Sequence, residues 1–463
     1  MKTFLQPLQN LAEMEEIQKQ AKKNRGILEI SGCMESQKAH LMYGLSGLFP
    51  CHLVIAADEK SAKELYEDYR FYDKRVYYYP AKDLLFFQAD IHGNLLIRQR
   101  MQVIRALLER EDEITVVTSI DGCMDYLAPL EKIEKQLIHF RNDSTLDMDK
   151  LTAALVHMGY ERVGQVEMPG QFSIRGGIID IYSLTEENPW RIELWGDEID
   201  SIRSFDAQSQ RSLENLDDVT IYPAAEQPME KNGVSFLDYF KETETLFFLD
   251  ELNHLEENAK AVQEEFQQSC ENRKEKGEIS LSGDWMCTWE ELCHKINDRN
   301  CVAMSLLDPK KSNWKISGQF NITVKSMSSY QSSFELLVKD LKQYKKEGYQ
   351  IVLLSGSRTR AERLAKDLQE EGLNAFYGQD SDRILQPGEI MVAYGHARRG
   401  FEYPLIKFAV ITETDIFGKE QKKRKKKKEY NGKRIQDFSE LSIGDYVVHE
   451  KHGLGIYKGI EKV

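Results

Sequence analysis

The residues of this chain with the clearest chemical meaning are Gly32 and Lys38. They belong to the stretch GCMESQKA, which follows an apolar run and has the spacing of a phosphate-binding loop. Such a loop needs a second glycine before the lysine, so that the backbone can wrap the phosphates, and a hydroxyl after it to hold magnesium. Gln37 and Ala39 occupy those two positions. The sequence therefore predicts a strand-to-helix turn that has lost nucleotide binding, and not an active ATP site.

Two acidic residues further along the chain could complete the same site. The apolar run LFFL ends in Asp250 and Glu251, at the place where a nucleotide-binding sheet holds its metal ion. A buried strand that ends in two acids is also common without a metal. Since the loop lacks its magnesium hydroxyl, we interpret both acids as relics. We expect no metal and no cofactor in this segment.

The elements around this loop predict a parallel sheet covered by helices. Apolar β-rich runs alternate with helical segments, which is the rhythm of βαβ units. The runs lie at Ile27–Ile30, His52–Ala56, Val76–Tyr79 and Ile114–Thr118, and the helical segments at Ser61–Phe71 and Leu95–Glu109. Helices and strands return later in the chain, so we assign residues 1–135 and 226–330 to two parts of one α/β domain.

Between those parts, residues 136–225 change to the pattern of antiparallel strands. Alternating runs at Trp190–Trp195 and Glu198–Phe205 flank a Gly-Asp pair and predict a β-hairpin. Alternation places Arg191 and Trp195 on the face opposite the apolar residues. Arginine and tryptophan dominate protein–protein contacts, whereas cross-strand charge pairing on a solvated sheet is the structural alternative. By pattern alone we favour the solvated sheet.

The remaining chain predicts a small α/β domain over residues 331–417. Its turn at Ser355–Arg358 could hold an anion at a helix amino terminus, but serine and glycine are also ordinary capping residues. The pair Arg398 and Arg399 could contact DNA or stay solvated. We favour the capping and the solvated interpretations.

Seven consecutive basic residues, Lys422 to Lys428, predict a disordered linker over residues 418–438. Their charge predicts weak, sequence-independent and salt-sensitive attraction to DNA. Residues 439–463 contain two short strand patterns that cannot form a barrel by themselves.

Bulk properties limit the possible classes of protein. The chain has 463 residues and a formal net charge of −14, so neither nucleic acid nor an anionic membrane should attract it as a whole. Seven scattered cysteines predict free thiols in a reducing compartment. No run approaches the roughly 20 apolar residues of a membrane span, and we expect a cytoplasmic protein.

Three segments resemble the bacterial transcription-repair coupling factor family. They read GYERVGQVEMPGQFSIRGGIIDIY, RIELWGDEIDSIRSFDAQSQRSL and GDYVVHEKHGLGIYKGI. The first two are also similar to the interaction domain of UvrB, a component of the UvrABC excinuclease. The resemblance covers essentially the whole chain, as the amino-terminal part of a longer protein. It implies a docking surface for UvrA, another component of that excinuclease, at Arg175, Arg191 and Trp195, and so favours docking over the solvated sheet.

The resemblance also implies an architecture and a function. The expected fold is a degenerate UvrB-like parallel-sheet domain with an inserted antiparallel docking domain, a small α/β domain, and the first strands of an RNA polymerase-interaction (CarD/Tudor-like) barrel at residues 439–463. The family recognises RNA polymerase stalled at DNA lesions, releases it with an ATP-dependent motor and recruits excision repair. This segment would be the non-catalytic recruiting module, while ATP and magnesium would serve a motor further along the longer protein. The alternative is a UvrB-like nucleotide-hydrolysing DNA repair enzyme.

Overall fold

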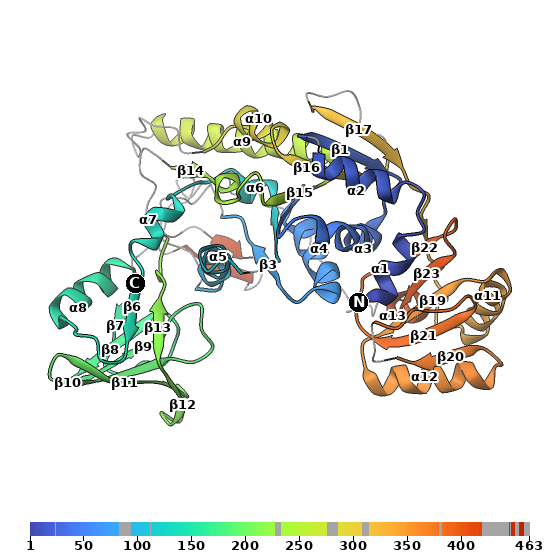
Figure 1. The fold of residues 1–463 in the computed structure, drawn as a ribbon. Coiled ribbons are helices and arrows are strands. Elements are labelled where there is room, and N and C mark those ends of the chain that lie inside the picture. Colours follow the sequence, from blue (N-terminus) through green and yellow to red (C-terminus); the bar gives the residue numbers. More distant parts are fainter. Residues whose placement is uncertain are drawn as a thin grey trace.

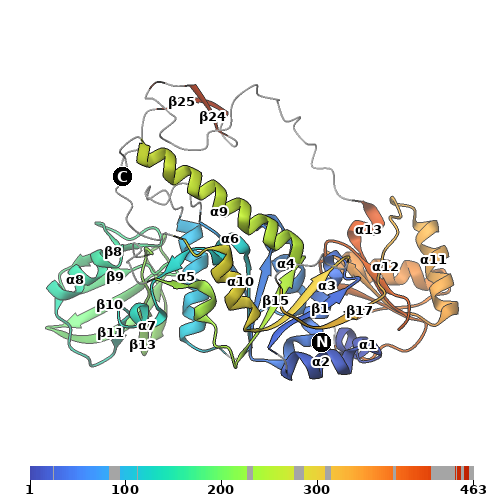
Figure 2. The same ribbon diagram turned by 90° about the horizontal axis from the view of Figure 1, so that it is seen from above.

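The computed structural model describes residues 1–23, 25–82, 94–111, 113–226, 233–275, 286–307, 314–378, 382–418, 444, 446–449 and 453–457. Three units follow one another in space: an antiparallel β unit at one end, a central α/β unit, and a second α/β unit at the other end (Figures 1 and 2). No helix among the described residues is long and apolar enough to cross a membrane.

The central unit contains a seven-stranded parallel sheet in the order β17-β1-β16-β15-β2-β4-β3. Its strands are β1 (Gly26–Ser31), β2 (Cys51–Ala56), β3 (Val76–Tyr79), β4 (Ile114–Ser119), β15 (Thr245–Asp250), β16 (Asn300–Ser305) and β17 (Ile316–Asn321). A two-stranded pair, β5 (Tyr126–Leu127) with β14 (Val234–Ser235), lies beside it. The four strands expected before residue 135 are all present.

Helices cover both faces of this sheet, because its strands are apolar on both sides. One face carries α1 (Lys2–Leu8), α2 (Met14–Lys23), α3 (Glu35–Leu45) and α4 (Glu59–Tyr72). The other face carries α5 (Asn94–Leu108), α6 (Ile120–Cys123), α9 (Leu252–Glu275) and α10 (Trp289–Asn297). Short helices η1 (Ser46–Leu48), α7 (Leu130–Glu134) and η3 (Phe236–Tyr239) complete the unit.

The antiparallel unit interrupts the central sheet between β4 and β15, as the sequence pattern predicts. Its six-stranded sheet has the order β12-β11-β10-β9-β8-β7, in which the pair β7–β8 is parallel and the other pairs are antiparallel. The elements are β6 (Ile138–Arg141), α8 (Met148–His157), β7 (Glu161–Arg162), β8 (Gln171–Arg175), β9 (Ile178–Ile181), β10 (Trp190–Trp195), β11 (Glu198–Phe205), β12 (Ser212–Leu216) and β13 (Asp218–Ile221). We call this the docking unit; its proposed boundaries remain residues 136 and 225.

Two adjacent glycines, Gly176 and Gly177, interrupt the run QFSIRGGIIDI, and such a pair predicts a bulge within one strand. This prediction is wrong, because the two glycines form the turn between β8 and β9. Gly176 has a φ of +61°, a conformation that glycine adopts without strain. This turn pairs β8 with β9 and brings Arg175 beside the predicted hairpin of β10 and β11.

The second α/β unit contains a mixed six-stranded sheet in the order β18-β22-β23-β19-β21-β20. Its elements are β18 (Lys325–Ser326), α11 (Phe334–Glu347), β19 (Gln350–Ser355), α12 (Arg358–Glu370), β20 (Asn374–Tyr377), β21 (Glu389–Tyr394), β22 (Phe401–Tyr403), β23 (Phe408–Thr412) and α13 (Glu413–Phe417). Strand β18 precedes the proposed start of this domain at residue 331, yet it pairs with β22.

The last described elements are β24 (Tyr446–His449) and β25 (Gly453–Ile456), an antiparallel pair. The basic run from Lys422 to Lys428 lies outside the described residues. Its predicted role therefore stays a prediction.

Candidate functional site

The outward face of the docking sheet gathers the predicted arginines around one buried carboxylate. Asp180 on β9 lies directly opposite Arg191 on β10, and its side chain is 1% exposed. The Arg191 guanidinium donates from Nε to Oδ1 at 2.7 Å and from Nη2 to Oδ2 at 2.9 Å. Arg175 Nη2 donates to the same Oδ2 at 2.6 Å. Asp180 was not among the predicted docking residues, although an acid inside the apolar run IIDI could have identified it from the sequence.

Arg191 is on the predicted face, but it is not a free side chain. Only 14% of it is exposed, and its guanidinium lies 4.4 Å from the centre of the Phe205 ring. It also donates to Gln210 Oε1 at 3.0 Å. The hydrogen bonds with Asp180 raise the pKa of Arg191. Much of this arginine's bonding capacity is therefore used within the sheet.

Trp195 and Arg175 are the predicted residues that solvent reaches most easily. Trp195 is 83% exposed at the end of β10, and the Arg175 side chain is 45% exposed. Tryptophan is enriched among the residues that contribute most to protein–protein binding, and this indole is accessible to a partner. Arg203 on β11 lies directly opposite Arg191, pairs with Glu193, and has a buried Nε without a partner in the described part of the chain. We call Arg175, Asp180, Arg191, Trp195 and Arg203 the docking face.

The structure also brings together the residues predicted for the residual nucleotide site. Lys38 Nζ lies 2.6 Å from Asp250 Oδ1 and 2.6 Å from Glu251 Oε1. Burial lowers the pKa of Lys38, but the charges of Asp250 and Glu251 outweigh this effect and raise it. The lysine is thus charged, and two carboxylates neutralise it. No unpaired positive charge from Lys38 is left to attract a phosphate.

The glycine of this loop has a structural explanation. Gly32 has a φ of +81°, and a Cβ there would lie 2.0 Å from the carbonyl oxygen of Ile322, just after β17. Any larger residue would collide with that strand end. The glycine at the start of this loop is therefore required by packing alone, without a bound nucleotide.

Gln37, which occupies the place of the second glycine, contacts the second α/β unit. Gln37 is fully buried, and its side-chain amide donates to the Tyr403 hydroxyl at 2.7 Å. His40, one turn further along α3, stacks with Phe401 and Phe408 at ring distances of 5.2 and 5.6 Å. Burial lowers the pKa of His40 to about 4, so this ring is neutral. Helix α3 therefore serves as a packing surface between the two α/β units.

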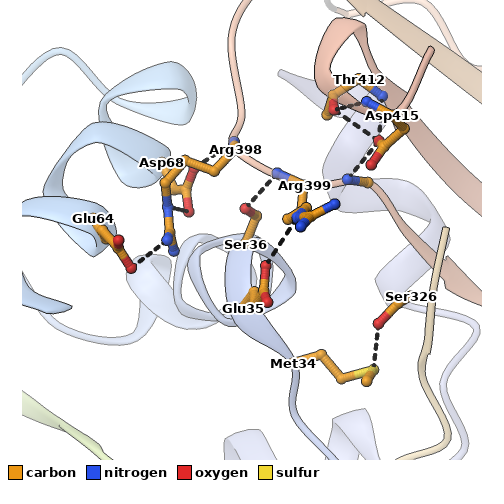
Figure 3. A network of polar contacts seen from close by, with 11 residues as sticks. Met34, Glu35, Ser36, Glu64, Asp68, Ser326, Arg398, Arg399, Thr412 and Asp415 are labelled. Carbon is orange, nitrogen blue, oxygen red and sulfur yellow. Dashed lines mark hydrogen bonds and ion pairs between the residues drawn. The ribbon is translucent and has the colours of Figure 1, made fainter. Parts of the chain in front are cut away.

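A polar network at the amino-terminal end of α3 joins the same two units (Figure 3). Arg398 donates from its backbone N and its Nε to the two oxygens of Asp68, at 2.9 Å each, and also pairs with Glu64. The backbone N of Arg399 donates to Ser36 Oγ at 3.1 Å. The expectation of a solvated Arg398 is wrong, because its partner Asp68 is 330 residues away in the sequence and has a side chain that is 1% exposed.

The turn at the start of α12 is closed by the protein itself. The backbone N of Gly356 donates to Glu413 Oε2 at 2.7 Å, and Arg360 pairs with Oε1 at 2.6 Å. A carboxylate from α13 thus satisfies the donor that an anion would have used. Ser357 is the N-cap residue of α12, but its side chain makes no capping hydrogen bond. The interpretation of an ordinary serine cap is therefore wrong, because Glu413 takes that part.

We expect the residual loop to bind no magnesium-ATP, because its lysine is neutralised and Gln37 fills the place of a glycine. Isothermal titration of the wild-type chain with magnesium-ATP should show no saturable heat that depends on Lys38. The Lys38→Ala variant should give a superimposable trace. A saturable wild-type signal that disappears in Lys38→Ala would contradict this prediction.

Comparison with known proteins places the docking unit and the rest of the chain in context. A family model described as UvrB interaction domain matches residues 138–226, and one described as CarD-like/TRCF RID domain matches residues 441–463. A transcription-repair-coupling factor from Bacillus subtilis is 32% identical over an alignment that covers 93% of this chain and 43% of the relative. Those from Staphylococcus haemolyticus and Staphylococcus epidermidis are 27% and 26% identical, and each covers more than four fifths of this chain. The chain spans only 38–43% of the length of these relatives.

Proposed function

We propose that this chain, which belongs to the transcription-repair coupling factor family, recruits UvrA through its docking face. In this proposal the segment works as a binding module of a factor that acts on RNA polymerase stalled at DNA lesions. The polymerase contact is assigned to the region of residues 441–463, which the second family model matches. A cytoplasmic location goes with this proposal.

The observation that carries the proposal is the exposure of Trp195 on a sheet that also holds Arg175 and Arg191 around Asp180. The indole is 83% exposed, and the partly exposed Arg175 is held in place by Asp180. An arginine that is already oriented loses little conformational freedom when it pairs with a partner's carboxylate. The exposed indole can fill an apolar pocket next to that ion pair. The same residues lie within the region that the UvrB interaction domain model matches.

We further propose that this segment contributes binding and no catalysis. The neutralised Lys38 and the buried Gln37 support this part of the proposal. The alternative, a nucleotide-hydrolysing enzyme similar to UvrB, would need an unpaired lysine and a backbone free to wrap phosphates. ATP and magnesium are accordingly assigned to the longer family proteins and not to these residues.

Replacement of Trp195 by alanine should weaken binding to UvrA by about 2 kcal/mol or more, roughly 30-fold in Kd. The indole contributes contact area to the partner but little to the fold, because it is 83% exposed. Surface plasmon resonance with immobilised UvrA measures the affinity. Thermal melts of the same samples should show an unchanged midpoint.

Val156→Ala is the matched control, because this apolar side chain is 56% exposed on α8, the helix that packs on the opposite face of the docking sheet. Its affinity should equal that of the wild type. Absence of wild-type binding would refute the proposal. Equal losses in both variants, or a loss that appears only together with unfolding, would show that Trp195 is not a docking residue.

A further inference from the structure

A second cavity lies between α4 of the central unit and the carboxyl ends of the parallel strands β19, β20 and β21. Its volume is about 730 Å³, and its walls include Arg70, Phe71, Lys74, Arg358, Tyr377 and Tyr394. The carboxyl ends of strands in an open parallel sheet are where ligands of this class of fold usually bind. This cavity is distinct from the one beside Lys38, which has a volume of about 590 Å³.

The charges of the two cavities differ in a way that points to an anionic ligand. Around the residual nucleotide site Lys38, Arg398 and Arg399 each lie within 4 Å of a carboxylate. In the second cavity Arg70 and Arg358 have no such partner in the described part of the chain. Lys74 Nζ donates to the backbone carbonyl of Arg70 at 3.1 Å. Glu67 is the single acid among the residues lining this cavity.

The chain as a whole has a formal net charge of −14, whereas this cavity is lined by Arg70, Lys74 and Arg358 and by one acid, Glu67. A bound polyanion would complement this local excess of positive charge. The positive charge of this cavity differs in origin from that of the basic run at Lys422–Lys428, which consists of consecutive residues. It is carried by Arg70 on α4, Lys74 just after that helix, and Arg358 at the start of α12, which the fold places around one cavity.

Aromatic rings lie among these cations. Tyr394 is 55% exposed at the end of β21, and the Arg358 guanidinium lies 5.6 Å from the centre of its ring. Phe71 and Tyr377 are partly exposed in the same walls. Exposed rings between cations are the usual means of binding a single nucleic-acid strand, in which bases stack on rings and phosphates contact the cations.

We propose that this cavity binds a segment of single-stranded nucleic acid. The phosphates lie against Arg70, Lys74 and Arg358, and a base stacks on Tyr394. A free nucleotide is less suitable, because its clustered phosphates need converging backbone donors, and the Gly356 N–H already donates to Glu413. An acidic peptide would satisfy the cations but would give Tyr394 no planar partner.

The test uses the full chain with the seven basic residues from Lys422 to Lys428 replaced by glutamine, so that the run contributes no binding of its own. The probe is a fluorescein-labelled oligothymidylate of about 15 nucleotides, long enough for one strand-binding site. Fluorescence anisotropy is measured at several salt concentrations. The variants are Arg70→Gln with Arg358→Gln, and Tyr394→Ser. Arg363→Gln is the control, because this arginine is on α12 outside the cavity and its side chain is 85% exposed.

The probe should still bind the glutamine-substituted chain. Loss of two phosphate contacts should make the slope of log K against log salt shallower by about 1.4, since each contributes about 0.7 on a single strand. Tyr394→Ser should weaken binding by about fivefold or more, the low end of what one stacked base contributes. Arg363→Gln should bind like its parent.

Three results would overturn the proposal. The first is the absence of binding once the basic run is replaced. The second is a double arginine variant that binds like its parent, or no more weakly than Arg363→Gln. The third is an unchanged affinity in Tyr394→Ser together with displacement of the probe by polyglutamate, which would assign the cavity to acidic peptides.

Discussion

Replacement of Arg100 by alanine will lower the free energy of unfolding of the central unit by about 3 to 5 kcal/mol. This side chain on α5 is fully buried, between Asp125 and Glu226, and donates from Nη1 to the Pro80 carbonyl at 2.9 Å. The variant would leave the buried Asp125 without its cation and Glu226 with Lys82 as its remaining cation. Burial raises the pKa of Glu226, but the charges of Arg100 and Lys82 outweigh it and hold the pKa at about 2.

The loss of stability should also affect the docking unit, because Glu226 is the residue at which the chain returns from the docking unit to the central unit. Helix α5 contacts the docking unit elsewhere too, because Arg105 pairs with the Glu186 side chain and Arg98 donates to its backbone carbonyl. Just beyond the helix, Glu109 accepts from the Tyr222 hydroxyl at 3.0 Å. Helix α5 therefore holds the docking unit against the central sheet. We expect Arg100→Ala to lower the cooperativity of unfolding as well as its free energy.

Urea titration followed by circular dichroism measures both effects. The matched control is Arg105→Ala on the same helix, because that side chain is 34% exposed and its ion pairs are reached by solvent. Its replacement should cost about 1 kcal/mol or less. Comparable losses of unfolding free energy in the two variants would show that burial does not determine how much Arg100 contributes to stability.

Replacement of Arg191 by alanine should destabilise the docking unit by about 3 kcal/mol. Asp180 is 1% exposed and, among the described residues, would keep Arg175 as its one ion-pair partner. The Phe205 ring would also lose the guanidinium that covers it. The affinity for UvrA should then fall for two reasons: a contact with the partner is lost, and part of the docking unit is unfolded. Thermal melts measure the unfolding, and affinity measurements on the folded protein measure the lost contact.

Arg175→Ala is the control, since this arginine contacts the same carboxylate but is 45% exposed. The free energy of unfolding of this variant should fall by about 1 kcal/mol or less, while its affinity for UvrA should still fall. A stable Arg191→Ala variant would mean that Asp180 finds other partners in the folded chain. It would also restore Arg191 as a side chain available to the partner.

The sequence by itself determined the local structure of this protein. Alternation of apolar and polar residues predicts the bounds of β10 and β11 to the residue. The reason is that successive side chains of a strand point to opposite faces of the sheet. The period of the helices likewise defines α11, from Phe334 to Glu347. Residue types at fixed spacing also identified Lys38, Asp250 and Glu251 as one cluster, since loops and strand ends of a parallel sheet meet at the same edge.

Only the tertiary structure decided which partners the charged and polar side chains have. Gln37 finds Tyr403 across 366 residues, and Arg398 finds Asp68 across 330. Periodicity indicates that a side chain is buried or exposed, but not what lies opposite, because that depends on how separate units pack. The same reason applies to Arg191: the sequence predicted the sheet face on which it lies, but not its ion pair with Asp180. It also explains the cationic cavity, whose walls come from segments around Arg70 and Arg358 that are distant in sequence and adjacent only after folding.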